Sequence, residues 1–189
     1  MAQRMSSLRS HRTREAILHA ARLHFAADGY QRATIRAIAA TASIDPSMVM
    51  RYYGSKERLF DAALDVDLGL PDLTGTPAET LPQTLITRFL APWENDTHEG
   101  SLRLLLRSAA TNERAADRLR GVLQEQFTHS LTGVLGPDRA AAASGLVAAQ
   151  LLGVAFARYL LRLQPIAELP VHALADLVAP SMRAALTAL

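Results

Sequence analysis

The chain has 189 residues, of which 49% are hydrophobic, 20% are charged and none is cysteine. This balance is typical of a globular protein, and a chain without cysteine has no disulfides, thiol catalysis or thiolate metal sites. The formal net charge is +2, but residues 1–60 hold ten Lys and Arg against four Asp and Glu, whereas residues 61–189 hold ten against fourteen. The first segment thus carries +6 and the rest −4, which predicts a polyanionic partner for the N-terminal third.

Apolar residues recur at helical spacing along almost the whole chain, and alternating strand patterns are nearly absent. This pattern predicts an all-α fold of about nine helices. The expected helices lie near residues 12–28, 34–41, 45–53, 55–64, 79–92, 99–110, 113–134, 138–164 and 171–188.

The expected ends of the first four helices coincide with capping residues. Thr34, Asp45 and Ser55 are suited to N-caps, and a proline follows Asp45 directly. Gly29 and Gly54 are suited to end the preceding helices. On the first helix, an apolar face is predicted to point into the core and carries Ile17, Ala21 and Phe25.

Residues 69–77 are the richest in Gly and Pro and read as a linker. We therefore expect two parts, a basic N-terminal domain over 1–60 and a helical domain over 61–189. Pro180 is expected to kink or interrupt the last helix. The uncharged segment 140–157 is diluted by alanine and predicts a buried helix rather than a membrane span. The N-terminus has no apolar signal core, so a cytoplasmic protein is expected.

The segment from Thr34 to Lys56 predicts two short helices joined by a tight turn, which need the first helix as a scaffold. Two short helices crossing a third form the helix-turn-helix arrangement, whose second helix enters the major groove of DNA. The alternative is an ordinary corner between two helices. The +6 charge of residues 1–60 favours the DNA-binding interpretation.

Three runs carry a family resemblance: ILHAARLHFA at residues 17–26, TIRAIA at 34–39 and YYGSKERLF at 52–60, together with Gly29-Tyr30. Over about residues 12–64 the chain resembles the N-terminal domain of the TetR/AcrR family of transcriptional regulators. The resemblance implies a third helix that reads operator DNA, phosphate contacts at the starts of the second and fourth helices, a C-terminal bundle that binds an effector, and a dimer. Met50 departs from the family, which commonly has an aromatic residue there, usually Tyr. This departure removes an expected contact between a tyrosine hydroxyl and a DNA phosphate, and leaves Arg51 or Tyr52 to replace it.

The residues expected at DNA are Thr34, Arg36, Pro46, Ser47, Met48, Arg51, Tyr52 and Lys56. By resemblance, Thr34 and Arg36 lie where groove and phosphate contacts are made, and Lys56 matches the phosphate-binding lysine of the family. Helix N-termini attract anions, which independently suits Lys56 to a phosphate. On the third helix, Ser47 can donate to a base or phosphate, and Arg51 can reach guanine or the backbone.

Some nearby residues have two interpretations. Asp45 is expected to be a helix cap rather than a reader of cytosine. Adjacent tyrosines point about 100° apart on a helix, so we expect Tyr53 in the core and Tyr52 toward phosphate. Four arginines near the N-terminus predict either a flexible DNA-binding arm or a solvated tail; they are Arg4, Arg9, Arg12 and Arg14.

A stripe of small residues at every fourth position, Gly145, Ala149, Gly153 and Ala157, permits close helix approach. One interpretation is that the stripe packs against another helix of the same chain. The other is that it forms the dimer seam, because a protein that binds palindromic DNA does so as a two-fold symmetric dimer. The expected partner of the stripe is the last helix, with Leu174, Leu177, Val178 and Met182.

A small apolar or amphipathic effector would need an apolar and aromatic pocket with a few polar groups. The proposed lining is Phe89, Trp93, Leu105, Phe127, Gln150, Phe156 and Tyr159, each of which also suits a packed core. The function predicted is a dimeric repressor that binds a palindromic operator and is released by the effector, without a metal or cofactor. The alternatives are a helical-bundle enzyme, against which the scattered histidines and the lack of Glu-x-x-His pairs argue, and a regulator without a small-molecule ligand.

Overall fold

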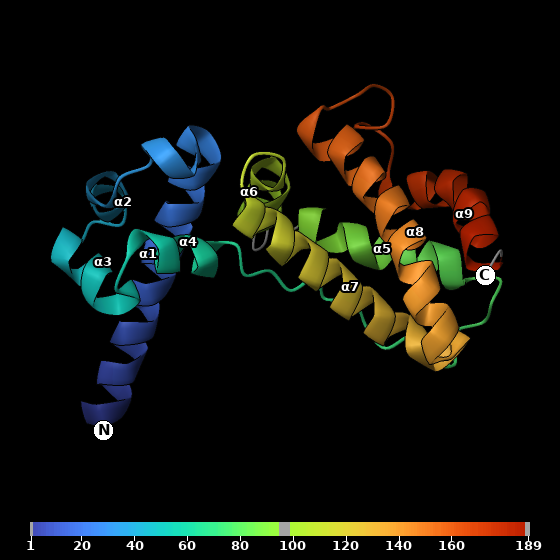
Figure 1. The fold of residues 1–189 in the computed structure, drawn as a ribbon, viewed down its shortest axis with the longest axis horizontal. Coiled ribbons are helices and arrows are strands. Elements are labelled where there is room, and N and C mark those ends of the chain that lie inside the picture. The colour runs from blue at the N-terminus through green and yellow to red at the C-terminus, as the bar shows by residue number, and fades with distance from the viewer. Residues whose placement is uncertain (1, 95–98, 188–189) are drawn as a thin grey trace. The chain divides into compact units, whose positions relative to one another are not determined.

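The computed structural model describes residues 2–94 and 99–187. Within these ranges the chain is helical and has no strand, as the sequence predicts. The helices are α1 (Ala2–Arg32), α2 (Ile35–Thr41), α3 (Pro46–Tyr53), α4 (Lys56–Ala63), α5 (Leu81–Glu94), α6 (Glu99–Ala109), α7 (Glu113–Leu135), α8 (Pro137–Ala155) and α9 (Val171–Thr187) (Figure 1).

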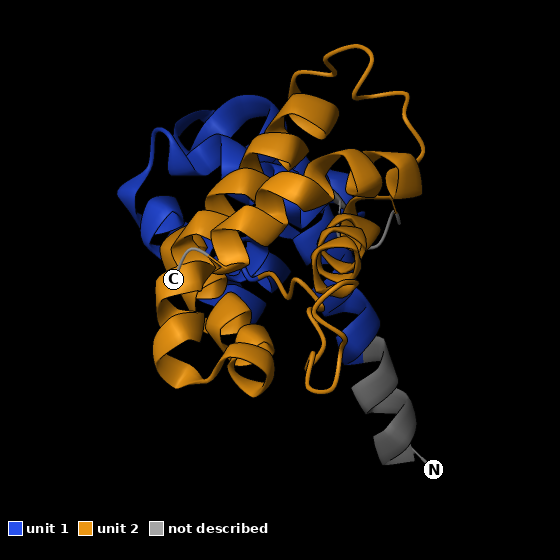
Figure 2. Cartoon of the chain, turned by 90° about the vertical axis from the view of Figure 1, so that its right-hand side faces the viewer, with its two compact units in different colours: residues 1–65, 100–118 blue, residues 66–99, 119–189 orange. Residues whose placement is uncertain are grey.

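The chain forms two compact units (Figure 2). Unit 1 comprises residues 1–65 and 100–118, and unit 2 comprises residues 66–99 and 119–189. Unit 1 thus holds the predicted DNA-binding segment and also α6 and the start of α7. A domain boundary after residue 60 stays a prediction, because the compact units interleave along the chain.

The predicted caps set the short helices of unit 1. Thr34 Oγ1 accepts from Ala37 N at 3.1 Å, and Ser55 Oγ accepts from Arg58 N at 3.1 Å. Gly54 ends α3 with φ 79°, a left-handed conformation that glycine adopts without strain. These local bonds satisfy N–H groups that would otherwise be unpaired at the helix starts.

The core of unit 1 forms where α1 packs against α2 and α4. Ile17, Ala21 and Phe25 are buried on one face of α1, as predicted. Phe25 meets Phe60 of α4 edge to face, with ring centroids 4.9 Å apart, and Tyr30 lies 4.8 Å from Phe60. This aromatic cluster fixes the end of α1 against α4.

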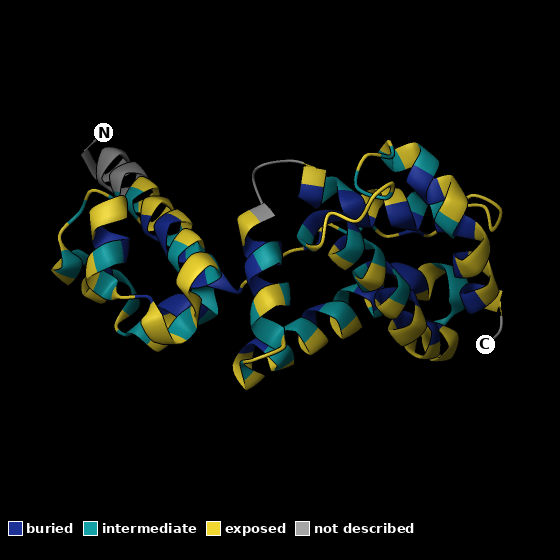
Figure 3. Cartoon of the chain, turned by 90° about the horizontal axis from the view of Figure 1, so that it is seen from above, coloured by how far each residue is buried: buried dark blue, intermediate teal, exposed yellow. Residues whose placement is uncertain are grey.

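Unit 2 is built on α5, α8 and α9, which pack against one another. Figure 3 shows buried and exposed residues occurring together along the helices. The core includes Leu85, Phe89 and Leu90 of α5 and Phe127 of α7, all at most 1% exposed.

Two sequence expectations for the helices are wrong. The helix expected over 138–164 leaves α-helical geometry after Ala155, and a π-helical turn follows at Phe156–Leu160. Pro180, expected to kink or interrupt the last helix, lies exposed inside α9, which continues past it to Thr187. The expected interruption is therefore wrong, and the kink stays a prediction. Packing of α9 against α5 and α8 outweighs the local cost of the proline.

The segment Pro137–Leu160 is long and apolar enough to cross a membrane by length and composition, with a mean hydropathy of 1.8 in its best window. Core helices of soluble proteins pass the same test. Here α8 packs against α5 and α9, and Val147 and Leu151 are fully buried between them and the rest of unit 2. One face of α8 thus belongs to the core of unit 2, which explains part of its apolar composition; 39% of the apolar window is buried.

Candidate nucleic-acid interface

The exposed face of α3 carries Ser47, Met50 and Arg51. These residues share a face because they lie three and four positions apart on a helix. Val49 faces the other way and is 1% exposed, so the core fixes which side of α3 meets solvent. Met48 is half-buried beside them.

The cap at the start of α3 is Asp45, whose Oδ1 accepts from Ser47 N at 2.8 Å. Hydrogen bonds from Ser47 lower the pKa of the Asp45 carboxyl. The interpretation of Asp45 as a cap is confirmed, and Pro46 follows it in the first turn, half-buried. The carboxylate therefore fixes the start of α3.

At the start of α2, Thr34 and Arg36 are both exposed. The Thr34 hydroxyl accepts the capping bond from Ala37 N, and its own proton stays available to a phosphate oxygen. The Arg36 side chain stands in the first turn of α2, at the positive end of the helix dipole.

At the start of α4, Lys56 is held by two contacts to the end of α1. Its Nζ donates to Gln31 O at 3.2 Å and lies 4.7 Å from the centre of the Tyr30 ring. An ammonium group has three donors, so this bond leaves two for a phosphate. The Tyr30 hydroxyl in turn donates to Glu57 Oε1 at 2.8 Å, which fixes the ring under the lysine.

The two tyrosines of α3 differ in their contacts. The Tyr53 hydroxyl donates to Arg14 O at 3.1 Å, and the Arg14 guanidinium lies 5.8 Å from the ring centre. Burial raises the pKa of Tyr53. Tyr53 thus faces α1 as expected, but it is half-buried and not a core residue. Tyr52 is also half-buried, and its predicted phosphate contact stays a prediction.

The N-terminal arginines belong to α1, which is helical from Ala2 onward. Arg12 and Arg14 are exposed, while the side chains of Arg4 and Arg9 lie outside the described residues. A helical backbone differs from the flexible arm that the sequence left open.

Sequence reasoning missed a ladder of two ion pairs within unit 1. Arg114 Nη2 lies 2.9 Å from Asp61 Oδ2, and Arg118 pairs in the same way with Asp65. Each partner is four residues from the next on its own segment, so α7 pairs with Asp61 of α4 and with Asp65, which lies just beyond the end of α4. The sequence shows the matching four-residue spacings, Asp61 to Asp65 and Arg114 to Arg118. It does not show that these two segments, about 50 residues apart, lie side by side.

The predicted dimer residues divide into exposed and buried sets. Gly145, Ala149 and Gly153 are exposed on α8, and Ala157 is half-buried within the π-helical turn. On α9, Leu177 is 68% exposed. The others are half-buried or buried on α9: Val178, Leu174 and Met182, the last two at 4% and 0% exposure. Leu174 and Met182 are core residues of unit 2 and offer no surface to a partner.

The predicted effector residues are only partly brought together. Phe89 and Phe127 are in contact, with ring centroids 5.8 Å apart, and Trp93 stacks on Tyr159 at 5.0 Å. Three residues lie elsewhere: Leu105 belongs to unit 1, Phe156 is 44% exposed, and Gln150 Nε2 donates to Ser181 O of α9 at 3.4 Å.

The π-helical turn places an arginine that the sequence did not single out. Arg158 is 8% exposed, and it pairs with Glu94 at 3.1 Å while donating to Ile166 O and Leu169 O. The Tyr159 hydroxyl donates to the same Glu94 oxygen at 2.5 Å. Burial, followed by this hydrogen bond, raises the pKa of Tyr159. The network fixes the segment after α8 on the end of α5.

Among the described residues, no group of three or more His, Asp or Glu is placed to hold a metal ion.

Comparisons with known proteins agree with this geometry. Residues 17–63 match the family model for bacterial regulatory proteins of the tetR family, and residues 79–186 match the model for the tetracyclin repressor-like C-terminal domain. Among curated proteins, no sequence matches the chain significantly.

Solved structures give the same result. A TetR-family regulator from Streptomyces coelicolor A3 is 31% identical, with a TM-score of 0.63 over 93% of this chain and 95% of that one. A TetR-like transcriptional regulator from Rhodococcus sp. RHA1 is 23% identical, with a TM-score of 0.64 over 92% and 93% of the two chains, and shares the fold.

Proposed function

Since the chain belongs to the TetR family of transcriptional regulators, we propose that it is a dimeric repressor that binds a palindromic operator and is released by a small molecule. The observation that carries the DNA-binding part is the row of exposed donors on α3. Ser47 and Arg51 are exposed on a helix whose opposite face is anchored by Val49. Regulators of this family bind DNA and are soluble proteins, and we place this one in the cytoplasm.

We assign base contacts to α3 and backbone contacts to the helices around it. Ser47, Met48 and Arg51 would meet base edges, and Met50, 43% exposed on the same face, adds an apolar contact of the kind a thymine methyl favours. The backbone contacts fall to Thr34, Arg36, Pro46, Tyr52 and Lys56.

The dimer seam is proposed on the exposed stripe Gly145, Ala149 and Gly153 of α8, with Leu177 of α9 beside it. A side chain added at either glycine would meet nothing within 4 Å, so this face is open in the isolated chain. The exposed Leu146 and Phe156, at 48% and 44%, support a surface that is covered by a second copy. Two-fold pairing would set the recognition helices about 34–36 Å apart for adjacent major grooves.

The effector is proposed to be a small apolar or amphipathic molecule bound in unit 2, near the Trp93–Tyr159 and Phe89–Phe127 pairs. Trp93 Nε1 is buried without a hydrogen-bond partner among the described residues, which supports a ligand acceptor at that position. In this proposal the effector-binding and dimerisation domain is 61–189 and the DNA-binding domain is 1–60.

Operator selection from a random duplex pool tests the proposal, followed by anisotropy titrations of two variants at several salt concentrations. Arg51→Ala should change the ranking of sequences and cost about 1–3 kcal/mol on the preferred site. Lys56→Ala should weaken binding to all sequences alike and lower the salt slope by about 1. Arg88→Ala, at an exposed arginine of α5 in unit 2, is the matched control. Wild-type binding by both test variants would refute the contact assignments.

A further inference from the structure

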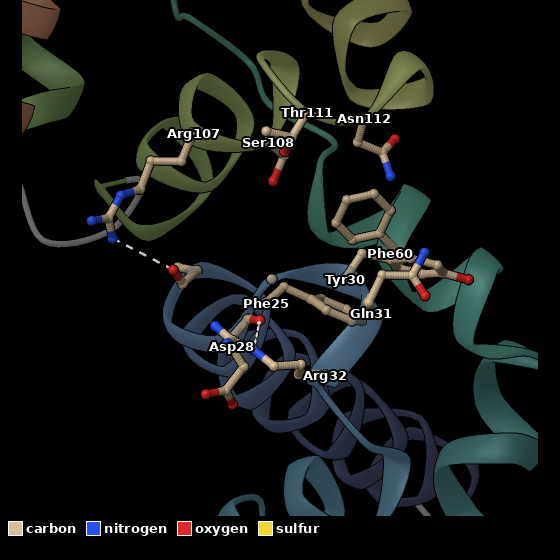
Figure 4. Close-up of a pocket in the computed structure, with 12 residues that line it drawn as sticks. Phe25, Asp28, Tyr30, Gln31, Arg32, Phe60, Arg107, Ser108, Thr111 and Asn112 are labelled. Atoms are coloured by element: carbon tan, nitrogen blue, oxygen red, sulfur yellow. Dashed lines mark hydrogen bonds between the residues drawn. The ribbon is translucent and has the colours of Figure 1, made fainter.

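A cavity of about 480 Å³ lies within unit 1, where the end of α1 meets α4 and the junction of α6 and α7 (Figure 4). This volume falls in the range of small-molecule sites. None of the residues predicted for an effector lines it. The cavity therefore needs its own explanation.

One wall of the cavity is aromatic and fixed. Phe25, Tyr30 and Phe60 line it, and each ring lies within 6.1 Å of the other two. Phe25 and Phe60 are each 1% exposed, so the half-buried Tyr30 presents the accessible ring of this wall. Tyr30 is further held by its hydrogen bond to Glu57 and by the Lys56 ammonium. Preformed aromatic faces favour flat ligands, because offset stacking adds to the burial of apolar area.

The opposite wall is polar. Ser108, Thr111 and Asn112 line it, and Figure 4 shows Ser108 and Asn112 projecting from the α6–α7 junction toward the aromatic rings. Asn112 Oδ1 accepts from Ala115 N at 3.2 Å, so its amide NH₂ stays available as a donor. Because α7 begins directly after Asn112, the positive end of its dipole lies at this wall.

The charges at the rim favour an anion. Arg107 is exposed there, and its hydrogen bond to Ala26 O is long, at 3.4 Å. Arg32 uses its Nε on Asp28 O at 3.0 Å. Asp28 also lines the cavity, and its Oδ2 lies 3.4 Å from Nδ1 of His24, which does not line it. Arg107 is thus the group best placed to bind a carboxylate in a two-pronged contact.

We propose that this cavity binds a small planar aromatic carboxylate, with its ring on the aromatic wall and its carboxylate on Arg107. Tyr30 lines the cavity and also orients Lys56 at the start of α4. A ligand in this cavity would therefore contact the ring that holds Lys56, the lysine assigned to a DNA phosphate, and would change the position of its ammonium group. This consequence rests on the proposed function, whereas the binding itself does not.

Calorimetric titration of the full chain with 2-naphthoate, in the absence of DNA, tests the binding. We expect a Kd of about 1 mM or tighter. Arg107→Gln should weaken binding about tenfold, and the uncharged probe 2-naphthamide should lose a similar factor against the wild-type protein. Arg88→Gln is the matched control and should bind as the wild type does. Thr111→Trp fills the cavity from an exposed position and should abolish binding.

Amide chemical shifts locate the probe. We expect the largest changes at Ser108, Thr111 and Asn112. The proposal is overturned if 2-naphthoate does not bind to the wild-type protein at about 10 mM. It is also overturned if the Arg107→Gln variant binds 2-naphthoate as tightly as the wild type does, or if the wild type binds 2-naphthamide as tightly as 2-naphthoate. Chemical-shift changes centred on Trp93 would overturn it as well. Because no duplex is present, these failures are distinct from a failure to bind operator DNA, which the anisotropy titrations report.

Discussion

Replacing Arg114 with Gln removes the guanidinium that pairs with Asp61 at 2.9 Å and leaves the second pair of the ladder in place. The two side chains are 60% and 43% exposed, so water screens their attraction. Two unit charges at contact distance in water attract by about 1 kcal/mol, and exposed pairs measured in proteins contribute about 0.2–1 kcal/mol. We therefore expect a coupling free energy of about 0.5 kcal/mol between Asp61 and Arg114.

A double-mutant cycle measures this coupling. The proteins are the wild type, Arg114→Gln, Asp61→Asn and the double variant, and the free energy of unfolding comes from urea titrations at low and high salt. In about 1 M salt the Debye length falls to about 3 Å and the coupling should nearly vanish.

The second pair supplies the control. Crossing Arg114→Gln with Asp65→Asn tests two residues that belong to different rungs of the ladder, and their coupling should be smaller than that of Arg114 with Asp61. Equal couplings in the two cycles, or a coupling of about 2 kcal/mol that persists in high salt, would refute the view of a screened, register-specific contact.

Three further predictions concern the seam, the cap and the core. Gly153→Leu should fold normally, because nothing lies within 4 Å of the added Cβ, but light scattering should show monomers. Gly121→Leu, at an equally open position of α7, is the control and should stay dimeric. Hydrogen bonds from Ser47 lower the pKa of Asp45, so the stability they add is present above about pH 4 and is lost as pH falls through the lowered value. Urea titrations should show Asp45→Ala less stable than wild type near neutral pH and a shrinking difference in acid; a constant difference would contradict the assignment. Phe60→Ala should lower the free energy of unfolding by about 3–5 kcal/mol, because it empties the centre of the aromatic cluster, and a loss below about 1 kcal/mol would show that the cluster is not a core.

The helices of unit 1 were predictable because their signals are local. Thr34, Asp45 and Ser55 cap as the sequence indicates, and each does so by bonding an N–H two or three residues ahead. The inward face of α1 was likewise visible in the four-residue spacing of Ile17, Ala21 and Phe25.

What the sequence did not reveal depends on contacts between distant segments. Glu94 and Arg158 are 64 residues apart, and only the fold shows that they pair. The same holds for the cavity of unit 1, whose two walls come from separate parts of the chain. Leu174 and Leu177 are both apolar and on one helix, so burial alone separates the core residue from the exposed one.

The π-helical turn limits how far the small-residue stripe of α8 extends. From Gly145 to Gly153 the helix rises about 12 Å, and the wider turn after Ala155 takes Ala157 out of register. A stable protein–protein interface buries about 800 Å² of accessible surface on each partner, which is more than a strip of this length provides. We therefore expect two copies to cross at this point rather than run side by side, with α9 widening the contact on either flank.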